Sequence, residues 1–117
     1  MIWPLAITTE RLILRPLQVG DYEQWYAGFS GRLPKQHQYD SGQENLEECD
    51  CVWFANLCQR HQEWAINDQI YVFGIFSQNT EQHLGNIDFS TLRRDNYQWA
   101  ILGYEIHNQF FNWLKMI

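Results

Sequence analysis

The sequence predicts an α+β domain: a four-stranded, mainly antiparallel sheet with two helices after the first strand. Three observations predict this class. A short alternating segment opens the chain, two stretches with apolar residues at helical spacing follow it, and three strand-like runs separated by short turns fill the second half. Strands joined by hairpins run antiparallel, and the helices are expected to pack against that sheet. The 117 residues fit one domain, 1–117.

The first strand and the first helix are predicted from the N-terminal quarter of the chain. Apolar and polar side chains alternate in ERLILRPL, which indicates a strand from about Glu10 to Pro16. Asp21 is a suitable N-cap for a helix, and Gln24 lies where a capping box needs a polar partner. Aromatic residues then recur at helical spacing, which predicts a helix from about Tyr22 to Phe29.

A polar loop and a longer helix are expected next. The segment Gly31 to Gln43, GRLPKQHQYDSGQ, is rich in helix breakers and predicts a loop. The second helix is expected from about Asn45 to Asn67, with acidic residues in its first turns, where the helix dipole favours negative charge. Its buried face is predicted to carry Leu46, Cys49, Trp53, Leu57 and Trp64, broadened by Phe54, Cys58 and Ala65.

Three strands are predicted in the second half of the chain. They span about Ile70 to Ser77, His83 to Leu92 and Tyr97 to His107, with QNTEQ and RRDN as the hairpin turns. The last strand carries apolar residues on both of its faces. This pattern is typical of a central strand that is covered above and below, and we expect that position for it.

Composition and charge argue against several classes of function. The net charge is −6 and the pI is about 5.0, so the surface disfavours nucleic acid and mildly favours an amine-bearing partner. No apolar run approaches the roughly 20 residues of a membrane helix, so no membrane partner is expected. The N-terminus shows no basic segment followed by an apolar one, and a cytoplasmic location is the default expectation.

The three cysteines, Cys49, Cys51 and Cys58, are expected to be reduced thiols. Cys58 and His61 are spaced to lie on one helix face, where they could share a metal ion. A second ligand pair at matched spacing is missing from the sequence, so core packing is the favoured interpretation and no metal is predicted.

Three segments carry a resemblance to a known family. TERLILRPLQVGDYEQWY, HLGNIDFS and LGYEIHNQFFN, in this order and spacing, resemble the GNAT superfamily of acetyl-CoA-dependent N-acetyltransferases. The branch that acetylates ribosomal protein N-termini is the most similar, and the resemblance runs from Thr9 to about Asn112. It implies transfer of an acetyl group from acetyl-CoA to a primary amine, on a protein N-terminus or a small molecule.

The resemblance also implies a segment that this sequence lacks. In the family the fourth strand leads to a glycine-rich turn and a helix, whose N-terminal N–H groups hold the coenzyme pyrophosphate. Here NWLKMI follows, and no glycine comes after Gly103. The chain therefore resembles the N-terminal part of an acetyltransferase, and we expect the isolated chain to be inactive.

Candidate site residues follow from the resemblance. It implies that backbone groups of Leu102, Tyr104, Glu105 and Ile106 pair with the pantetheine arm of the coenzyme. Glu105 is the first candidate for a general base, and His107, whose ordinary pKa lies near neutral pH, is the second. The alternatives are a polar residue at a strand end for Glu105 and a turn histidine for His107.

The acceptor amine is expected to lie between the long loop and the third predicted strand. Tyr39 in the loop and Asp88 and Ser90 on the strand are the candidates for substrate binding; the alternative for Asp88 and Ser90 is a solvent-exposed face. The six tryptophans could form an aromatic cage for a cation. Core packing is favoured instead, because four of them fall on predicted buried faces: Trp25, Trp53, Trp64 and Trp99.

Two classes of function therefore stand side by side. The first is an acetyl-CoA-dependent N-acetyltransferase acting on an amine. The second is a non-catalytic remnant that binds a partner through the unpaired edge of its last strand. Phe110, Phe111 and Trp113 in the tail would form an apolar patch, so we expect a homodimer through the last strand and this aromatic tail.

Overall fold

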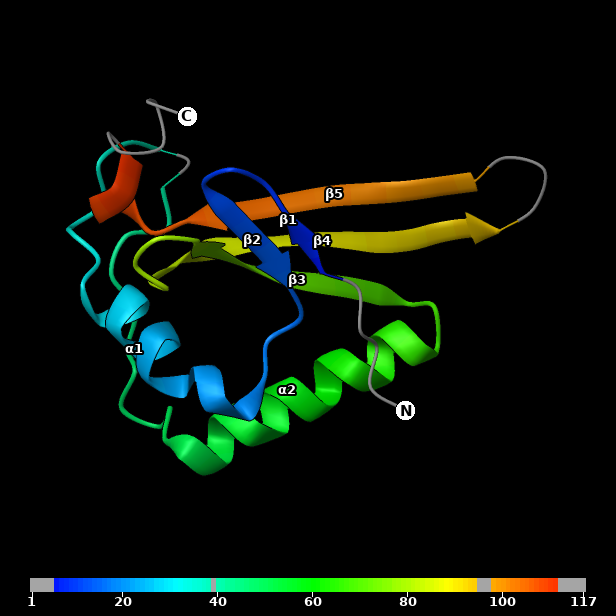
Figure 1. Ribbon diagram of the computed structural model, residues 1–117, viewed down its shortest axis with the longest axis horizontal. Helices are drawn as coiled ribbons and strands as arrows, with labels where there is room; N and C mark the ends of the chain where they lie inside the picture. Colours follow the sequence, from blue (N-terminus) through cyan, green and yellow to red (C-terminus); the bar gives the residue numbers. More distant parts are fainter. Residues whose placement is uncertain (1–5, 39, 95–97, 112–117) are drawn as a thin grey trace.

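The computed structural model describes residues 6–38, 40–94 and 98–111. It contains one five-stranded sheet in the order β1-β2-β3-β4-β5, in which every pair of neighbours is antiparallel (Figure 1). The strands are β1 Ile7–Thr8, β2 Leu12–Arg15, β3 Ile70–Ser77, β4 His83–Arg94 and β5 Gln98–Ile106. The α+β class is confirmed, with five strands rather than the four predicted.

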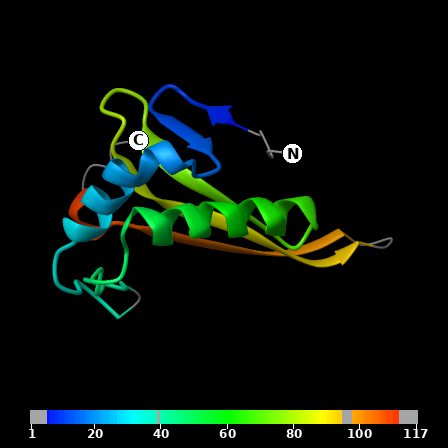
Figure 2. The same cartoon turned by 90° about the horizontal axis from the view of Figure 1, so that it is seen from below.

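Two α-helices, α1 Tyr22–Ser30 and α2 Cys51–Ile66, lie on one face of the sheet (Figures 1 and 2). Short 3₁₀ turns, η1 Val19–Asp21 and η2 Asn108–Phe110, precede α1 and follow β5. The main core forms where the helices meet the sheet, and it contains mainly aromatic residues: Leu17, Trp25, Phe29, Phe54, Cys58 and Phe76. The described residues contain no helix long and apolar enough to cross a membrane.

Helix α2 begins six residues later than predicted. Asp50 is its N-cap, because the Asp50 side chain accepts a hydrogen bond of 2.8 Å from the backbone N–H of Trp53. Leu46 still packs on the core, but from an irregular segment. Its apolar side chain continues the helical spacing, and the predicted helix was too long for this reason. The buried face is also rotated from the predicted one: Trp53 is 38% exposed, and the buried residues are Phe54, Cys58, His61 and Ala65.

The predicted cap of α1 is also wrong in its chemistry. Asp21 stands at the N-cap position, but its carboxylate makes no cap hydrogen bond. Both of its oxygens instead accept from the Arg15 guanidinium at 2.7 Å, and one also accepts from the Gln18 N–H at 2.8 Å. A charged partner on the neighbouring strand therefore takes the place of the cap.

Strand β5 lies at the edge of the sheet, so the predicted central position is wrong. Its only strand partner is β4, among the residues that the structure describes. The apolar side chains on both of its faces are open: Ile101 is 56%, Leu102 57% and Tyr104 75% exposed. The unpaired edge expected for the last strand is thus present, and apolar residues alone did not indicate burial here.

The described part of the aromatic tail folds back on the molecule. Phe110 is half-buried with its ring centroid 6.4 Å from that of His107, and Phe111 stacks on His37 at 5.8 Å. These two rings are not part of an exposed patch. Trp113 lies outside the described residues, as does Tyr97.

Candidate functional site

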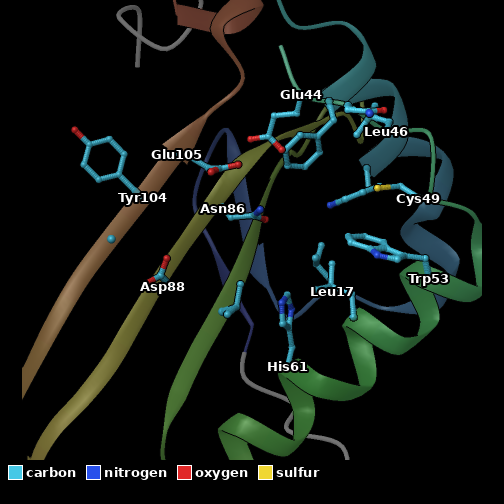
Figure 3. Close-up of a pocket in the computed structure, with 16 residues that line it drawn as sticks. Leu17, Glu44, Leu46, Cys49, Trp53, His61, Asn86, Asp88, Tyr104 and Glu105 are labelled. Atoms are coloured by element: carbon cyan, nitrogen blue, oxygen red, sulfur yellow. The ribbon is translucent and has the colours of Figure 1, made fainter. Parts of the chain in front are cut away.

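A cleft of about 580 Å³ lies between the helices and the strands β4 and β5 (Figure 3). Its sheet side is mostly polar, and its helix side is mostly apolar. The polar lining comes from Glu44, Asn45, Asn86, Asp88 and Glu105, and the apolar lining from Leu17, Trp25, Phe29, Leu46, Trp53, Leu57 and Val72. A volume of this size is typical of sites that bind small molecules.

Strand register brings the polar groups of the sheet to one face. Asn86 on β4 pairs with Glu105 on β5, and Asp88 pairs with Gly103. Because alternate residues share a face, Asn86, Asp88 and Glu105 all point toward the helices. Gly103 leaves room for Asp88, since a Cβ at residue 103 would lie 3.0 Å from Asp88 Oδ1. An antiparallel pair thus places two carboxylates and an amide along one wall of the cleft.

A buried polar chain ends at this wall. Arg32 donates from Nε to His107 Nδ1 at 2.8 Å and from Nη2 to Glu105 Oε1 at 2.8 Å. His107 Nε2 lies 2.9 Å from His83 Nδ1, and His83 Nε2 lies 2.9 Å from Asn86 Oδ1. We call this set of five residues the histidine chain. Both of its ends, Glu105 and Asn86, line the cleft.

The hydrogen-bond directions in the histidine chain follow from Arg32, which can only donate. His107 Nδ1 must therefore accept, so His107 Nε2 carries the proton and donates to His83 Nδ1. His83 in turn donates from Nε2 to the carbonyl oxygen of Asn86. The Asn86 NH₂ group has no acceptor among the residues that the structure describes, and it can donate to a ligand in the cleft.

Both histidines of this chain are neutral. Burial lowers the pKa of His83 to about 4, against the effect of its hydrogen bond to Asn86. Burial, and then the neighbouring His83 ring and the charge of Arg32, lower the pKa of His107 to about 2. Neither side chain is exposed at all. A single cation, Arg32, therefore serves the whole chain and stacks over the Phe29 ring at 4.4 Å.

His61 is the polar exception on the helix side of the cleft. It rises from α2 into the cleft, as Figure 3 shows, and it is only 8% exposed. Its Nδ1 is buried and has no hydrogen-bond partner in the structure. Such an atom costs roughly 1–3 kcal/mol of folding free energy. Burial, and then the charge of Arg60, lower the pKa of His61 to about 4, so the ring is neutral.

The predicted site residues are only partly brought together. Glu105 and Asp88 line the cleft, whereas Ser90 shares their face of β4 but lies outside the lining. Tyr104 contributes to the lining, but its ring points away from the cleft (Figure 3). His107 is buried in the histidine chain and does not line the cleft.

The remaining predicted contacts lie elsewhere. Leu102 and Ile106 alternate with Gly103 and Glu105, so they belong to the other face of β5. Tyr39 lies outside the described residues. Its neighbour Asp40 is buried and ties the loop to the end of β5, accepting from Asn108 Nδ2 at 3.0 Å and from the Gln36 N–H at 2.8 Å. These bonds, with that of Asn108 first, lower the pKa of Asp40 to about 2.

Four functional-site residues were missed from the sequence: Glu44, Asn86, His61 and Arg32. Asn86 carried a signal, because it alternates with Asp88 and so shares its face. His61 also carried one, since it follows Cys58 and Phe54 at helical spacing. Arg32 lies in a polar loop, and its partners Glu105 and His107 are 73 and 75 residues away, so no local pattern indicated it.

Cys49 lines the cleft, but no thiol belongs to the histidine chain. All three cysteines are free, as predicted, and Cys58 is buried in the core. Burial raises the pKa of Cys58 to about 11, so it is a protonated thiol at neutral pH. The ranges 6–38, 40–94 and 98–111 hold no group of three or more metal-binding side chains.

Comparison with known proteins supports the fold. No protein-family model matches the sequence, and no curated protein matches it significantly. A Vibrio cholerae structure provisionally assigned as a ribosomal-protein-serine acetyltransferase matches 97% of this chain with a TM-score of 0.72 and 19% identity. RimJ from Mycobacterium smegmatis, solved with CoA-disulfide, matches 93% with a TM-score of 0.67 and 15% identity. A Bordetella pertussis protein provisionally assigned to the GNAT-family acetyltransferases matches 92% with a TM-score of 0.59 and 18% identity.

These matches define the extent of the likeness. The chain spans 60%, 56% and 61%, respectively, of the three matched structures. The resemblance inferred from the sequence is thereby confirmed for the fold, which is that of GNAT-family acetyltransferases over most of this chain. At such identities the likeness concerns the fold, and function has to be argued from the site.

Proposed function

We propose that this protein takes part in the transfer of an acetyl group from acetyl-CoA to a primary amine. One observation carries the proposal: the cleft has carboxylates of Asp88 and Glu105 on adjacent antiparallel strands, facing an apolar wall. A carboxylate wall attracts an ammonium group and can remove its proton. The acetyltransferase fold of the matched structures supports the same reaction class.

The chemistry of the transfer assigns roles to this wall. An ammonium group must lose a proton before its nitrogen can attack the thioester carbonyl carbon. The new C–N bond forms, the C–S bond breaks, and the electron pair leaves with the sulfur as a thiolate. The nitrogen then loses its second proton to that thiolate, which gives the neutral amide and the free thiol. Glu105 or Asp88 accepts the ammonium proton in this scheme. Arg32 holds one Glu105 oxygen at 2.8 Å, which leaves the other oxygen to face the amine.

The coenzyme would supply the activated acetyl group and the thiolate leaving group. The residues present fit one part of it. The outer edge of β5 has no strand partner among the described residues, so its backbone groups are open to an extended pantetheine arm. Leu102, Tyr104, Glu105 and Ile106 remain the predicted contacts there. The described residues after β5 form only the short turn η2, so we assign no pyrophosphate contacts.

The resemblance led us to expect an inactive isolated chain, whereas the cleft supports a transfer role for it. The test that decides between them is a transfer assay on the 117-residue chain with acetyl-CoA and a panel of primary amines. Mass spectrometry of the amines reports acetylation directly, and calorimetric titration with acetyl-CoA reports coenzyme binding. We expect Glu105→Gln or Asp88→Asn, whichever removes the base, to lower the transfer rate 10²–10⁴-fold. Coenzyme binding without transfer to any amine would contradict the proposal for this chain.

A second candidate function is favoured by the open strand β5. We propose that the chain alternatively acts as a non-catalytic, self-associating domain, with a second copy pairing along β5. The exposed Leu102 and Tyr104 flank the unpaired edge and would be covered in such a homodimer. Light scattering at micromolar concentration should then give twice the monomer mass. A monomeric mass for the unsubstituted chain, unchanged in Tyr104→Lys, would contradict the homodimer.

A further inference from the structure

We propose that the cleft takes a primary amine with an aromatic body that ends in a hydroxyl group. The inference rests on the proposed function, because it treats the cleft as the site of the acceptor amine. It follows from the three parts of the cleft lining, which differ in chemistry: a carboxylate wall, an apolar aromatic wall and a buried imidazole.

The carboxylate wall would bind the ammonium head. Glu105 has one oxygen on Arg32, and Glu44 is 3.5 Å from the same guanidinium and 46% exposed in its side chain. Asp88 has no hydrogen-bond partner among the described residues, and Gly103 opposite leaves its carboxylate uncovered. The wall therefore carries more negative charge than Arg32 balances. A cation is the ligand that completes it.

The apolar wall would bind the body of the ligand. Trp53 lines the cleft and is 38% exposed, which is a large share for an indole ring. Leu17, Leu46 and Leu57 extend the same wall, and Figure 3 shows Trp53 beside Leu17 and above His61. A flat aromatic ring would cover this surface and stack on the indole. A ligand with charges at both ends would have to place its second charge against these apolar side chains.

The imidazole of His61 would bind the far end of the ligand. Its Nδ1 is buried, lacks a partner, and belongs to a ring that is more than nine-tenths buried and faces the cleft (Figure 3). Because the ring is neutral, Nδ1 can donate to or accept from a hydroxyl group, depending on the tautomer. A hydroxyl serves either tautomer, which makes it the group that fits the site best.

The test is calorimetric titration of the 117-residue chain, without coenzyme, using three primary amines. Tyramine carries all three features, phenethylamine lacks the hydroxyl, and putrescine replaces the ring and hydroxyl with a second ammonium group. We expect tyramine to bind about fivefold more tightly than phenethylamine, the equivalent of one neutral hydrogen bond, and putrescine to bind most weakly. Putrescine binding as tight as tyramine, or no tyramine binding at millimolar concentration, would overturn the inference.

A variant separates the hydroxyl contact from general apolar binding. His61→Phe keeps a flat ring on α2 and removes both nitrogens, so we expect tyramine and phenethylamine to bind equally. Val52→Ala is the matched control, because Val52 lies on the same helix, is 69% exposed and does not line the cleft. It should keep the fivefold preference. A tyramine preference that survives in His61→Phe would overturn the assignment of His61.

A second measurement needs no variant. In ¹⁵N spectra of the histidine rings, tyramine should shift the His61 Nδ1 signal, and phenethylamine should shift it much less. Equal shifts with both ligands would contradict the hydroxyl contact even if His61→Phe failed to fold. Because these experiments contain no coenzyme, their outcome is separate from that of the transfer assay. Acetyl transfer to amines without preference for tyramine would contradict this inference and leave the proposed function intact.

Discussion

The histidine chain and the carboxylates of the cleft both lie on the helix-facing side of β4 and β5, and they differ in what completes their hydrogen bonds. In the histidine chain, Arg32, His107 and His83 are all at most 3% exposed and find their partners inside the molecule. Asp88, two residues after Asn86 on β4, lines an open cleft and has no hydrogen-bond partner among the described residues. The same sheet therefore carries one finished polar network and one unfinished one.

The difference separates what holds the fold from what remains available to a ligand. A buried polar group without a partner lowers stability, so an internal network has to be complete. A carboxylate beside water has no such requirement, because water solvates it until a ligand binds. Changes in the histidine chain should therefore appear mainly in the free energy of unfolding, and changes in the cleft mainly in binding.

The largest effect is expected from Arg32→Met, which removes the only cation of the histidine chain. His107 Nδ1 and Glu105 lose their donor, and the free energy of unfolding should fall by about 3–5 kcal/mol. Urea denaturation measures it. Arg60→Met, at an exposed position of α2, should change the same quantity by no more than about 0.5 kcal/mol. Similar losses in both variants would remove the distinction between the two regions.

Acidification should weaken the fold through the buried neutral histidines. The pKa values of His61 and His83 are about 4 in the folded protein and return to about 6.5 on unfolding. As the pH falls, the unfolded chain therefore binds protons before the folded protein does. The stability that the neutral histidines contribute is complete above pH 6.5 and is lost as the pH falls towards 4. We expect a loss of about 1.4 kcal/mol per pH unit for each histidine. Urea midpoints at pH 7, 6 and 5 measure this loss. A midpoint that does not change with pH would contradict the neutral state of His61 and His83.

A smaller loss is expected from Gly28→Ala, where α1 crosses the histidine chain. The added Cβ would lie 2.5 Å from His107 Nε2 and 2.8 Å from the His83 carbonyl oxygen. The His107 ring and the His83 backbone must then move away from α1, which should cost about 1–3 kcal/mol. Thermal unfolding compares this variant with Gly20→Ala, where nothing lies within 4 Å of the new methyl group. A Gly28→Ala protein as stable as the Gly20→Ala protein would show that the contact between α1 and the histidine chain tolerates displacement.

The smallest effect on stability is expected from Asp88→Asn in the cleft. The carboxylate has no partner to lose within the described part of the chain, so the free energy of unfolding should change by no more than about 0.5 kcal/mol. Amine binding should weaken strongly, because the ammonium group loses a full charge. Parallel urea and calorimetric titrations give both quantities. Loss of stability with unchanged binding would reverse the roles assigned to the two regions.

Sequence reasoning recovered the elements whose period is local. β3 was predicted with its observed bounds, Ile70 to Ser77, and α1 ends one residue beyond its predicted end. The two-residue strand β1 was missed because it is too short for a period to register. Helix α2 was predicted too long because Leu46 and Cys49 continue its apolar spacing. The start of the helix is set by the Asp50 cap, which is a single side-chain hydrogen bond.

The site was recovered only where a strand pattern carried it. Asp88 and Glu105 both line the cleft. Alternation along β4 indicated the face of Asp88, whereas Glu105 was singled out only through the family resemblance, and the strand pairing brings the two together. The interpretation of His107 as a turn residue did not anticipate its burial, because that depends on Arg32, 75 residues earlier in the chain. Long-range pairing of this kind leaves no trace in a window of neighbouring residues.

The separation between Arg32 and its partners also bears on how the chain folds while it is being made. At about 5–20 residues per second, translation would take roughly 4–15 seconds to reach His107 after Arg32 has been added. During that interval the guanidinium has no permanent partner, and the loop that carries it cannot be buried. Consolidation of α1 and the loop therefore has to wait for the last strand, so the N-terminal third of this protein should be late to fold although it is first to be synthesised.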